Sequence, residues 1–423
     1  MTDKIINIGI LGLGTVGTGV VKVLKKYDCL KIKKIAVRNT NKKRDVDIEG
    51  ILTDNPFEIT NDPDISIVVE VMGGTDPAFQ LVTDAIRNGK HIVTANKELL
   101  AKRGPEIYEL AREKNVAVLY EASVGGGIPI IMPMKQSLAA NKITSMAGIL
   151  NGTTNYILTK MEQENSEFAD VLKEAQELGY AEPDPTSDVE GHDAAYKLSI
   201  LASIAFGYRI NINDIYCEGI SNITPVDIAY ASELGYKIKL IAMASIKDDN
   251  KLDVRVHPAL VSKTHPLASI NGVTNALTVY GDAVGQVNFS GPGAGQMPTA
   301  SAVVGDILAI VREMDMTVNV LPSMKCTHKL NATIVPIEDT VSKFYVRFNS
   351  LDQPGVIGHM GMSCGNHGVS LLGVIQKDML LGGQARIILL THEVKESALR
   401  AAIDEISLHF STKQIANVIR VFR

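Results

Sequence analysis

The segment that most constrains the fold is a glycine-rich turn near the start of the chain. Gly12-Leu-Gly-Thr-Val-Gly17 directly follows an aliphatic run, Ile5–Leu11, and opens a helical pattern over Val16–Lys26. In such a unit the first glycine permits a tight turn, the second lets the backbone approach a pyrophosphate, and the third allows close helix–strand packing. The motif alone is weak, but this context predicts a dinucleotide site at the helix N-terminus. Its predicted cofactor-binding residues are Gly12, Gly14, Thr15, Val16 and Gly17.

Aliphatic runs alternate with amphipathic stretches through the first third of the chain, as in βα units. Because parallel strands need crossover helices, this alternation predicts an α/β fold with a doubly wound parallel sheet of the Rossmann type. The expected strands are Ile5–Leu11, Lys31–Val37, Ile65–Val71, His91–Thr94 and Val116–Tyr120. The expected helices are Val16–Lys26, Pro77–Asn88 and Pro105–Asn115.

The pattern changes after Ile143, where long helices precede β-rich sequence and predict an α+β second domain. Near the end, Phe344, Val346 and Phe348 alternate as in a strand, and the order βαββαβ predicts a ferredoxin-like module. The expected domains are 1–132 for the nucleotide, with the helix 296–315 packing back on it, 133–295 as the α+β domain, 316–340 as a linker, and 341–423 as the C-terminal module.

Composition narrows the class of protein. The 423 residues are 45% apolar and 21% charged, with a formal charge of −5, so a disordered chain or a basic surface for nucleic acid or anionic lipid is excluded. No apolar run is long enough for a membrane helix, and the N-terminus has no signal-peptide pattern. The 4 cysteines show no CxxC spacing. We expect a soluble, cytoplasmic protein that binds neither nucleic acid nor membrane.

The end of the second expected strand discriminates between the two nicotinamide cofactors. An NAD site places Asp or Glu about 20 residues beyond the glycine motif, where the carboxylate binds the ribose 2′-hydroxyl. This chain has Arg38 there, followed by Lys42, Lys43 and Arg44. A guanidinium suits a 2′-phosphate, so NADP is favoured, with NAD still possible. The alternative is a solvated basic loop.

An acidic segment precedes a lysine on a mostly apolar helix. Asp193 and Lys197 are four residues apart on the helix His192–Phe206, so they share one face. The arrangement suits an ammonium-bearing substrate and proton transfer, although a solvated acidic loop with an ordinary ion pair is the alternative. Burial would lower the pKa of Lys197 and the carboxylates would raise it, and the sequence leaves this balance open. The segment's carboxylates are Glu182, Asp184, Asp188, Glu190 and Asp193.

The run from Gly179 to Lys197, GYAEPDPTSDVEGHDAAYK, resembles the substrate-site motif of homoserine dehydrogenases. Residues 344–423 resemble an ACT regulatory domain, with Leu351-Asp-Gln-Pro-Gly355 at its first strand–helix turn. The resemblance is to the monofunctional form with a C-terminal ACT domain. Further matching motifs are Thr94-Ala-Asn-Lys97, Glu121-Ala-Ser-Val-Gly-Gly-Gly-Ile-Pro129, Asn151-Gly-Thr-Thr-Asn155 and Gly291-Pro-Gly-Ala-Gly295.

The resemblance implies a role for each matching residue. Lys197 would exchange the proton at the reacting oxygen, with Asp193 and Lys97 beside it in the catalytic set. The implied substrate-binding residues are Glu182, Asp188, Asp193, Gly152 and Thr153. The implied cofactor-binding residues beyond the glycine turn are Arg38, Thr75, Lys97 and Gly295. The implied ligands of a monovalent cation, Na⁺, are Glu121, Val124, Gly126 and Ile128.

The function that the resemblance implies is NAD(P)-dependent interconversion of L-homoserine and L-aspartate 4-semialdehyde, in threonine, methionine and isoleucine biosynthesis. It also implies that 133–295 is the domain for substrate binding, catalysis and dimerisation, in a homodimer or homotetramer. Threonine is the implied allosteric effector of the ACT domain. One alternative is a phosphorylating semialdehyde dehydrogenase, which needs a nucleophilic cysteine, and Cys217 lacks an adjacent base. The other is a non-catalytic sensor of nucleotides and amino acids, which would not need Lys197 or Glu182.

Overall fold

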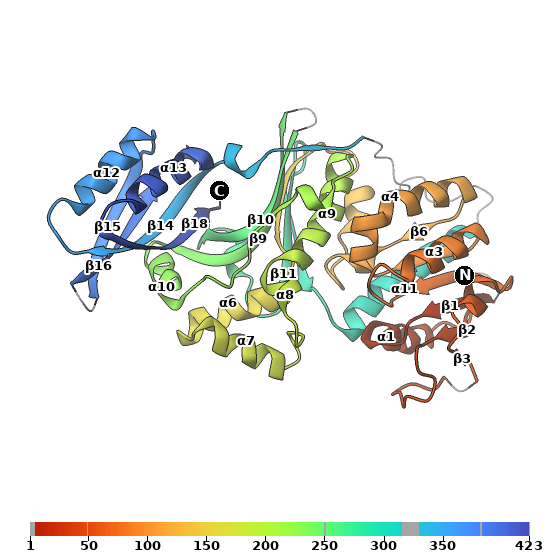
Figure 1. Ribbon diagram of the computed structural model, residues 1–423. Coiled ribbons are helices and arrows are strands. Elements are labelled where there is room, and N and C mark those ends of the chain that lie inside the picture. Colours follow the sequence, from red (N-terminus) through yellow and green to blue (C-terminus); the bar gives the residue numbers. More distant parts are fainter. Residues whose placement is uncertain (1–4, 49, 249–250, 315–329, 381–382, 423) are drawn as a thin grey trace.

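The computed structural model describes residues 5–48, 50–248, 251–314, 330–380 and 383–422. Two β-sheets follow one another along the molecule. The N-terminal sheet lies at one end and the C-terminal strands at the other, with the helices α6–α10 around the middle of the second sheet (Figure 1).

The first sheet is parallel, with strand order β3-β2-β1-β4-β5-β6, which confirms the predicted doubly wound sheet. Its strands are β1 (Ile6–Leu11), β2 (Leu30–Ala36), β3 (Leu52–Thr53), β4 (Ile65–Glu70), β5 (His91–Thr94) and β6 (Val118–Leu119). Its helices are α1 (Thr15–Leu24), α2 (Phe57–Thr60), α3 (Ala78–Arg87), α4 (Lys97–Lys114) and α11 (Gln296–Met314). The late helix α11 packs on α1 so closely that a Cβ at Gly19 would lie 2.4 Å from the Gln296 carbonyl oxygen.

Helix α4 corrects one sequence prediction. It begins at Lys97 and contains Pro105, where the sequence predicted a helix starting at Pro105. The early start is fixed by Asn96, whose side-chain oxygen accepts a hydrogen bond from the Leu99 amide at 3.0 Å. The short elements β3 and α2 were not predicted, because two and four residues show no periodicity.

The second sheet has the order β12-β11-β7-β9-β10-β18-β14-β16-β15. Its first part contains β7 (Ile143–Ile149), β8 (Tyr216–Cys217), β9 (Tyr236–Asp248), β10 (Lys251–Ser262), β11 (Thr274–Gly281), β12 (Gly285–Pro292) and β13 (Thr333–Ile334). Helices α6, α9 and α10 all contact β9. The helices of this part are α5 (Ile131–Lys135), α6 (Gly152–Glu164), α7 (Phe168–Glu177), α8 (Thr186–Val189), α9 (His192–Phe206) and α10 (Pro225–Glu233).

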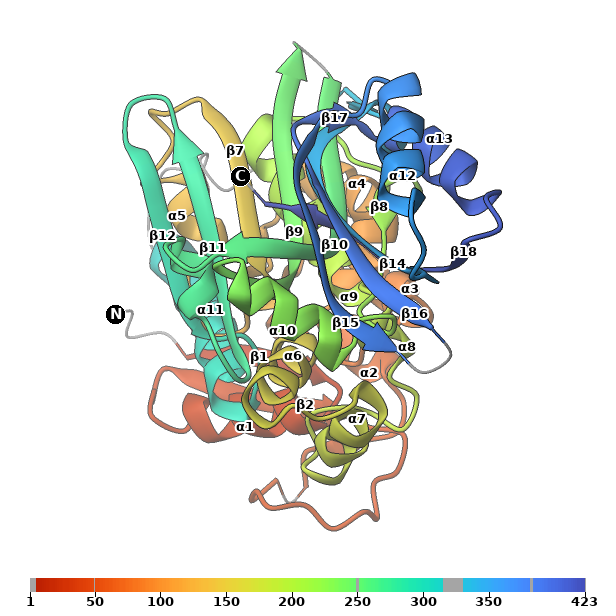
Figure 2. The same cartoon turned by 90° about the vertical axis from the view of Figure 1, so that its left-hand side faces the viewer.

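The C-terminal strands continue this second sheet (Figure 2). Strand β18 runs parallel to β10, with Arg420 opposite Ala259, and antiparallel to β14. Phe344, Val346 and Phe348 of β14 face a small core under the helices, as their alternation predicts, while Tyr345 belongs to the large core. The elements are β14 (Val341–Leu351), α12 (Val356–Asn366), β15 (Leu371–Leu380), β16 (Gln384–Thr391), β17 (Val394–Lys395), α13 (Glu396–Ser407) and β18 (Thr412–Val421).

The predicted linker 316–340 falls outside the described residues up to position 329. Its last part is attached to the second sheet, because β13 pairs with β10. Within the described residues, no helix has both the length and the apolar character needed to cross a bilayer.

Candidate active site

The carboxyl ends of four parallel strands meet at one edge of the first sheet. Leu11 of β1 pairs with Ala36 of β2 and with Glu70 of β4, and Glu70 pairs with Thr94 of β5. Because β1 and β4 are neighbours with connections to opposite sides, this edge is the switch point where nucleotides bind in such sheets. The predicted cofactor residues that follow these strand ends are Gly12, Arg38, Thr75 and Lys97.

The glycine turn has the geometry that a pyrophosphate needs. Gly12 has φ +101°, and a Cβ there would lie 2.8 Å from the Val71 carbonyl oxygen. A Cβ at Gly17 would lie 2.4 Å from the Gly12 carbonyl oxygen, whereas Gly14 faces open space. No side chain caps α1, so its first amides can receive an anion. Thr15 begins this helix and is exposed.

In the basic loop after β2, Arg44 and Arg38 have different roles: one stabilises the loop, and the other has its guanidinium open to a ligand. Arg44 donates to the carbonyl oxygens of Lys42 and Asn39, both at 2.7 Å, so it holds the loop together. Arg38 is exposed and makes no side-chain hydrogen bond or ion pair with another described residue. Its guanidinium is therefore available to a phosphate group.

One buried carboxylate, missed by the sequence analysis, organises the same edge. Glu70 is fully buried and accepts hydrogen bonds from the Thr94 hydroxyl at 2.6 Å and the Met72 amide at 2.8 Å. Asn96, which caps α4, also donates to Glu70 at 3.4 Å. Burial raises the pKa of Glu70, and these donors oppose that rise. The network fixes the loop after β4 and the helix start that carries Lys97.

Asp193 joins two lysines, one from α4 and one from α9, into one polar cluster. It is buried in the first turn of α9, and its Oδ1 lies 2.8 Å from the Nζ of Lys97, at the start of α4. Its Oδ2 accepts from the Nζ of Lys197 at 2.6 Å and from the Nδ2 of Asn151 at 2.9 Å. The predicted Asp193–Lys197 pair therefore exists, and Lys97 reaches it from the cofactor edge.

Asn151 is a member of this cluster that the predicted site did not include. As the N-cap of α6, its Oδ1 accepts from the Thr154 amide at 2.8 Å. Its amide group donates to Asp188 at 2.6 Å and to Asp193 at 2.9 Å. The sequence shows a capping residue before a helix, but the contacts with two carboxylates from a later segment depend on tertiary structure.

The hydrogen bonds of Lys197 leave one position for a substrate. Its Nζ donates to Asp193 and to the Leu150 carbonyl oxygen at 2.7 Å, so within the described structure the third N–H of the ammonium is not used. Burial and the charge of Lys97 lower the pKa of Lys197, although Asp193 opposes them. Burial would raise the pKa of Asp193, but the two ammonium groups hold it well below its usual range.

The other predicted substrate residues lie around the cluster with different roles. Asp188 is half-buried, and its pKa is raised by burial and by the charge of Asp193. Glu182 is exposed, and its carboxylate makes no hydrogen bond or ion pair with another described residue. The Thr153 hydroxyl donates to the Tyr180 carbonyl oxygen at 2.7 Å and so holds the acidic segment. Gly152 lies against backbone that leaves no room for a Cβ.

The carboxylate of Glu121 caps the N-terminal end of α5. Its Oε1 accepts from the amides of Ile130 and Ile131, and its Oε2 from Met132, at 2.6, 2.7 and 2.7 Å. Its own amide donates to the buried Asp306 at 2.8 Å. With the carboxylate bound in this way, carbonyl oxygens would have to supply most ligands of the expected cation. The site formed by Glu121, Val124, Gly126 and Ile128 stays a prediction.

Two glycine-rich turns pack against each other beside the cluster. Gly126 has φ +57°, and a Cβ there would lie 2.5 Å from the Gly293 carbonyl oxygen. The Gly127 amide donates to the Pro292 carbonyl oxygen at 3.1 Å. Gly295, with φ +122°, ends the second turn directly before α11, which packs on α1. This places Gly295 close to the phosphate end of the predicted cofactor site.

Comparison with known proteins decides the family. Residues 12–121 match the model of the homoserine dehydrogenase NAD-binding domain, and residues 129–308 match the homoserine dehydrogenase model. A homoserine dehydrogenase from Synechocystis sp. is 51% identical over 430 residues, which cover 98% of this chain and 99% of that protein. The chain belongs to the homoserine dehydrogenase family.

Solved homoserine dehydrogenases share the fold. The crystal structure of the enzyme from Thiobacillus denitrificans is 42% identical, covers 99% of this chain and 98% of its own, and gives a TM-score of 0.93. A hyperthermophilic archaeal homoserine dehydrogenase in complex with NADPH is 27% identical, covers 73% of this chain and 98% of its own, and gives a TM-score of 0.63. The predicted resemblance to homoserine dehydrogenases is confirmed.

As a homoserine dehydrogenase, the protein is an NAD(P)-dependent oxidoreductase that interconverts L-homoserine and L-aspartate 4-semialdehyde. The sensor alternative is therefore excluded. The thioester alternative also lacks its nucleophile, because the thiol of Cys217 donates to the Glu190 carbonyl oxygen at 3.2 Å and burial raises its pKa to about 12.

Proposed function

We propose that Lys197 is the proton donor and acceptor of the homoserine dehydrogenase reaction. The observation that supports this role is its unused third N–H, on a buried amine whose pKa is lowered by burial. In homoserine oxidation the neutral amine takes the hydroxyl proton, and in semialdehyde reduction the ammonium returns it to the carbonyl oxygen. The nicotinamide, when bound, accepts or supplies the hydride.

The carboxylates around Lys197 bind and orient the amino-acid end of the substrate. Asp193 is held as an anion by two lysines, and Asp188 lies beside it on α8. Glu182 is exposed at the edge of the same segment, where its carboxylate is available to the substrate ammonium. Lys97 reaches both the cofactor edge and Asp193, so it aligns the substrate with the nicotinamide ribose. Gly152 and Thr153 shape the start of α6.

The cofactor is NADP in preference to NAD. Exposed Arg38 follows the strand end where an NAD site has an acid, and a related archaeal enzyme is known in complex with NADPH. Arg38→Asp should weaken NADPH binding by roughly 10- to 150-fold, since it removes one charge-assisted contact, and should leave NADH binding almost unchanged. Initial rates with the two cofactors test this. Equal changes in both Michaelis constants would refute the 2′-phosphate role of Arg38.

The C-terminal part, 341–423, is an ACT domain through which threonine inhibits the enzyme. Its element order, β14-α12-β15-β16-α13-β18, supports this assignment. The turn Asp352-Gln-Pro-Gly355 between β14 and α12 forms the effector site. Millimolar threonine should lower the rate of the full-length enzyme, and Asp352→Ala should relieve that inhibition without changing kcat. A wild-type rate that threonine leaves unchanged would refute threonine control.

The enzyme assembles as a homodimer through its second domain, 133–295, or as a homotetramer with ACT domains paired. Strand β15 ends the second sheet, and its Leu372 and Val374 are 54% and 39% exposed, which supports pairing of this edge. Analytical ultracentrifugation of the wild type and of Leu372→Lys/Val374→Lys separates the two states. Loss of a tetramer in the double variant supports ACT pairing, and an unchanged mass refutes it.

A monovalent cation, Na⁺, stabilises the turn after β6. Burial and the charge of Glu121 raise the pKa of Asp306 well above its usual value, and a cation nearby would offset this negative charge. Thermal unfolding in NaCl and in choline chloride at equal ionic strength tests the ion, which should raise the midpoint. The enzyme works in the cytoplasm, a reducing compartment, since among the described residues Cys217 and Cys364 form no disulfide.

A further inference from the structure

A short segment, Tyr216–Ser221, lies between the C-terminal strand β18 and the helices that carry the substrate carboxylates. Its first two residues form β8, which pairs with β10 at Arg255 and Val256, and the Glu218 amide donates to the Val256 carbonyl oxygen at 2.8 Å. Strand β18 pairs with the same edge of β10 only a few residues further on. The segment and β18 are therefore neighbours along one strand.

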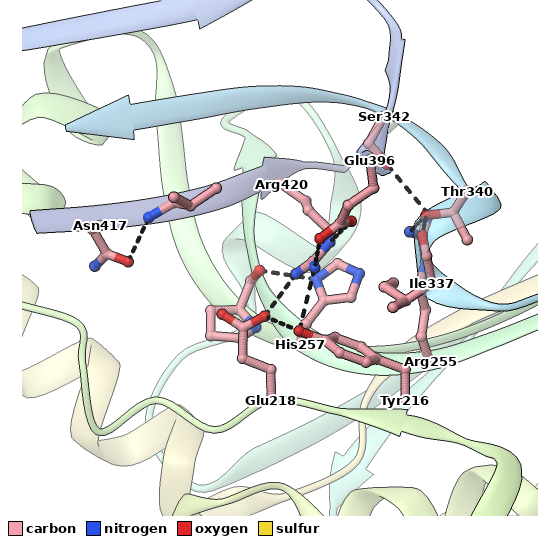
Figure 3. Close-up of polar contacts among 12 residues, drawn as sticks. Tyr216, Glu218, Arg255, His257, Ile337, Thr340, Ser342, Glu396, Asn417 and Arg420 are labelled. Carbon is pink, nitrogen blue, oxygen red and sulfur yellow. Dashed lines mark hydrogen bonds and ion pairs between the residues drawn. The ribbon is translucent and has the colours of Figure 1, made fainter. Parts of the chain in front are cut away.

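Arg420 of β18 holds this segment from the C-terminal side (Figure 3). Its side chain is 1% exposed, and its Nη1 donates to Glu218 Oε2 at 2.7 Å. The Tyr216 hydroxyl donates to the same oxygen at 2.7 Å. On its other side, Arg420 Nε donates to Glu396 Oε2 at 2.8 Å. Arg420 Nη2 also donates to Glu396, so Glu396 holds the guanidinium in place while Nη1 points to Glu218. Without Glu218 the buried Nη1 group would lose its carboxylate acceptor, so this contact fixes the position of Glu218.

On its opposite side the segment is bonded to α8 and to the residue after it. The Ile220 amide donates to the Val189 carbonyl oxygen at 2.9 Å. The Ser221 hydroxyl donates to Glu190 Oε1 at 2.6 Å, and the Cys217 thiol donates to the Glu190 carbonyl oxygen at 3.2 Å. These contacts fix the end of α8, where Asp188 directly precedes Val189.

The segment packs closely against the ends of α8 and α9, as two glycine positions show. A Cβ at Gly219 would lie 2.4 Å from the Val189 carbonyl oxygen. A Cβ at Gly191 would lie 3.0 Å from the Cys217 sulfur, and Gly191 is the N-cap of α9, two residues before Asp193. A displacement of the segment must therefore move the ends of α8 and α9 as well.

We propose that Arg420 and Glu218 are positioning residues for the substrate site, which act on Asp188 and Asp193 through the segment Tyr216–Ser221. The C-terminal strand thereby sets the affinity for the amino-acid substrate without contacting it. The inference rests on the proposed substrate role of Asp188.

The test is the kinetics of the full-length Glu218→Gln enzyme. Because the ion pair with Arg420 is lost, the Michaelis constant for aspartate semialdehyde should rise about tenfold, the usual weight of one charge-assisted hydrogen bond. The Michaelis constant for NADPH and kcat should stay within about twofold, since within the described structure the segment makes no hydrogen bond to Lys197 or to the strand ends of the cofactor edge. Gly219→Ala should raise the same constant by displacing α8, while Gly365→Ala, at an open position in α12, should not.

Two comparisons separate positioning from general damage. Glu396→Gln removes the charge of the other partner of Arg420. Glu396 belongs to α13, which does not form the substrate site, so this variant should keep the Michaelis constant for the semialdehyde near wild type. Arg420→Lys should retain part of the affinity that Arg420→Met loses. An equal effect of Glu396→Gln, or equal changes in kcat and both Michaelis constants for Glu218→Gln, would overturn the proposal.

Asp188→Asn, measured in parallel, distinguishes the two levels of the argument. If it leaves the semialdehyde constant unchanged, the proposed substrate role of Asp188 is wrong and the positioning proposal falls with it. If it raises that constant while Glu218→Gln does not, the site assignment stands and the positioning proposal alone is overturned.

Discussion

Asp193 in the active site and Asp227 at the start of α10 are both buried carboxylates held by basic side chains, but their surroundings differ. Asp227 is fully buried and accepts from Arg347 through Nε at 2.7 Å and Nη2 at 3.0 Å. Tyr345 and Asn417 of the C-terminal strands also donate to it at 3.2 and 2.9 Å, and so does the Thr224 hydroxyl at 2.8 Å. The Arg347 side chain that pairs with Asp227 is only 7% exposed. The Lys97 side chain that pairs with Asp193 is 40% exposed, so the Asp193 cluster is open to solvent on that side.

The difference shows how the same ion pair serves stability in one place and chemistry in another. At Asp227 one guanidinium faces one carboxylate, and arginine stays charged at every accessible pH. At Asp193 two lysines share one carboxylate, and the pKa of the more buried one, Lys197, is lowered by burial and by the charge of Lys97. Lysine can titrate, so this cluster can exchange a proton with a substrate.

The largest expected effect belongs to Lys197→Met. Removal of the proton donor should lower kcat by ~10²–10⁴, the usual contribution of a positioned acid or base. The protein should stay folded, because Asp193 retains Lys97 and Asn151. Steady-state rates and a thermal melt measure the two properties. Near-normal turnover would transfer the proton role to another group, with Lys97 the first candidate.

Arg347→Met should have the opposite profile. It leaves the Asp227 charge buried and unpaired, which costs about 3–5 kcal/mol of unfolding free energy. Below the unfolding transition kcat should stay within about twofold, since the hydrogen bonds of the Arg347 side chain go to Asp227 and Thr224 and not to the Asp193 cluster. Urea unfolding and kinetics test this. The double variant Arg347→Met/Asp227→Asn should recover part of the lost stability, and a large fall in kcat at full folding would show that the two clusters are coupled.

Glu182→Gln should have a smaller effect, confined to the active site. The Glu182 carboxylate is exposed and makes no hydrogen bond or ion pair with another described residue, so the substitution should not change the melting temperature. The Michaelis constant for homoserine should rise about tenfold if the carboxylate meets the substrate ammonium. Glu177→Gln, at the exposed end of the preceding helix α7, is the matched control. Identical constants for the two variants would remove Glu182 from the site.

The smallest effect concerns pH. Homoserine oxidation needs neutral Lys197, so its kcat should rise with pH through a midpoint below 10.5, the ordinary lysine value. Because the Lys97 charge lowers the pKa of Lys197, Lys97→Met should move this midpoint to higher pH. Semialdehyde reduction needs the ammonium and should fall through the same midpoint. A profile that does not move in the Lys97 variant would show that the two lysines do not interact.

Much of the first sheet follows from local pattern. The Ile5–Leu11 run, the glycine turn and the helix behind it were predictable because each depends on residues adjacent in the chain. Helix α6 was missed, since its apolar face is weak and its start depends on the Asn151 cap. The early start of α4 depends on a cap in the same way.

In the site, too, the residues that were predictable are those whose arrangement depends on neighbours in the chain. Asp193 and Lys197 were predictable as a pair, because four residues on a helix place two side chains together whatever the tertiary fold. Family resemblance added Lys97 and Asp188, but no local spacing relates them to Asp193. Glu70 was missed, and Asn151 appeared only in a matching motif and not among the predicted site residues. Each is a common residue type whose partners come from distant segments.

The sequence by itself determined the parallel sheet, the phosphate turn, the family and the alternation of Phe344, Val346 and Phe348 toward one core. Only the tertiary structure decided that the other face of β14 is buried as well, where Arg347 meets Asp227, and that β18 continues the sheet from β10. It also decided that burial outweighs the carboxylate in lowering the pKa of Lys197. The physical reason is that period and capping act over a few residues, whereas desolvation and charge pairing depend on everything packed around a group.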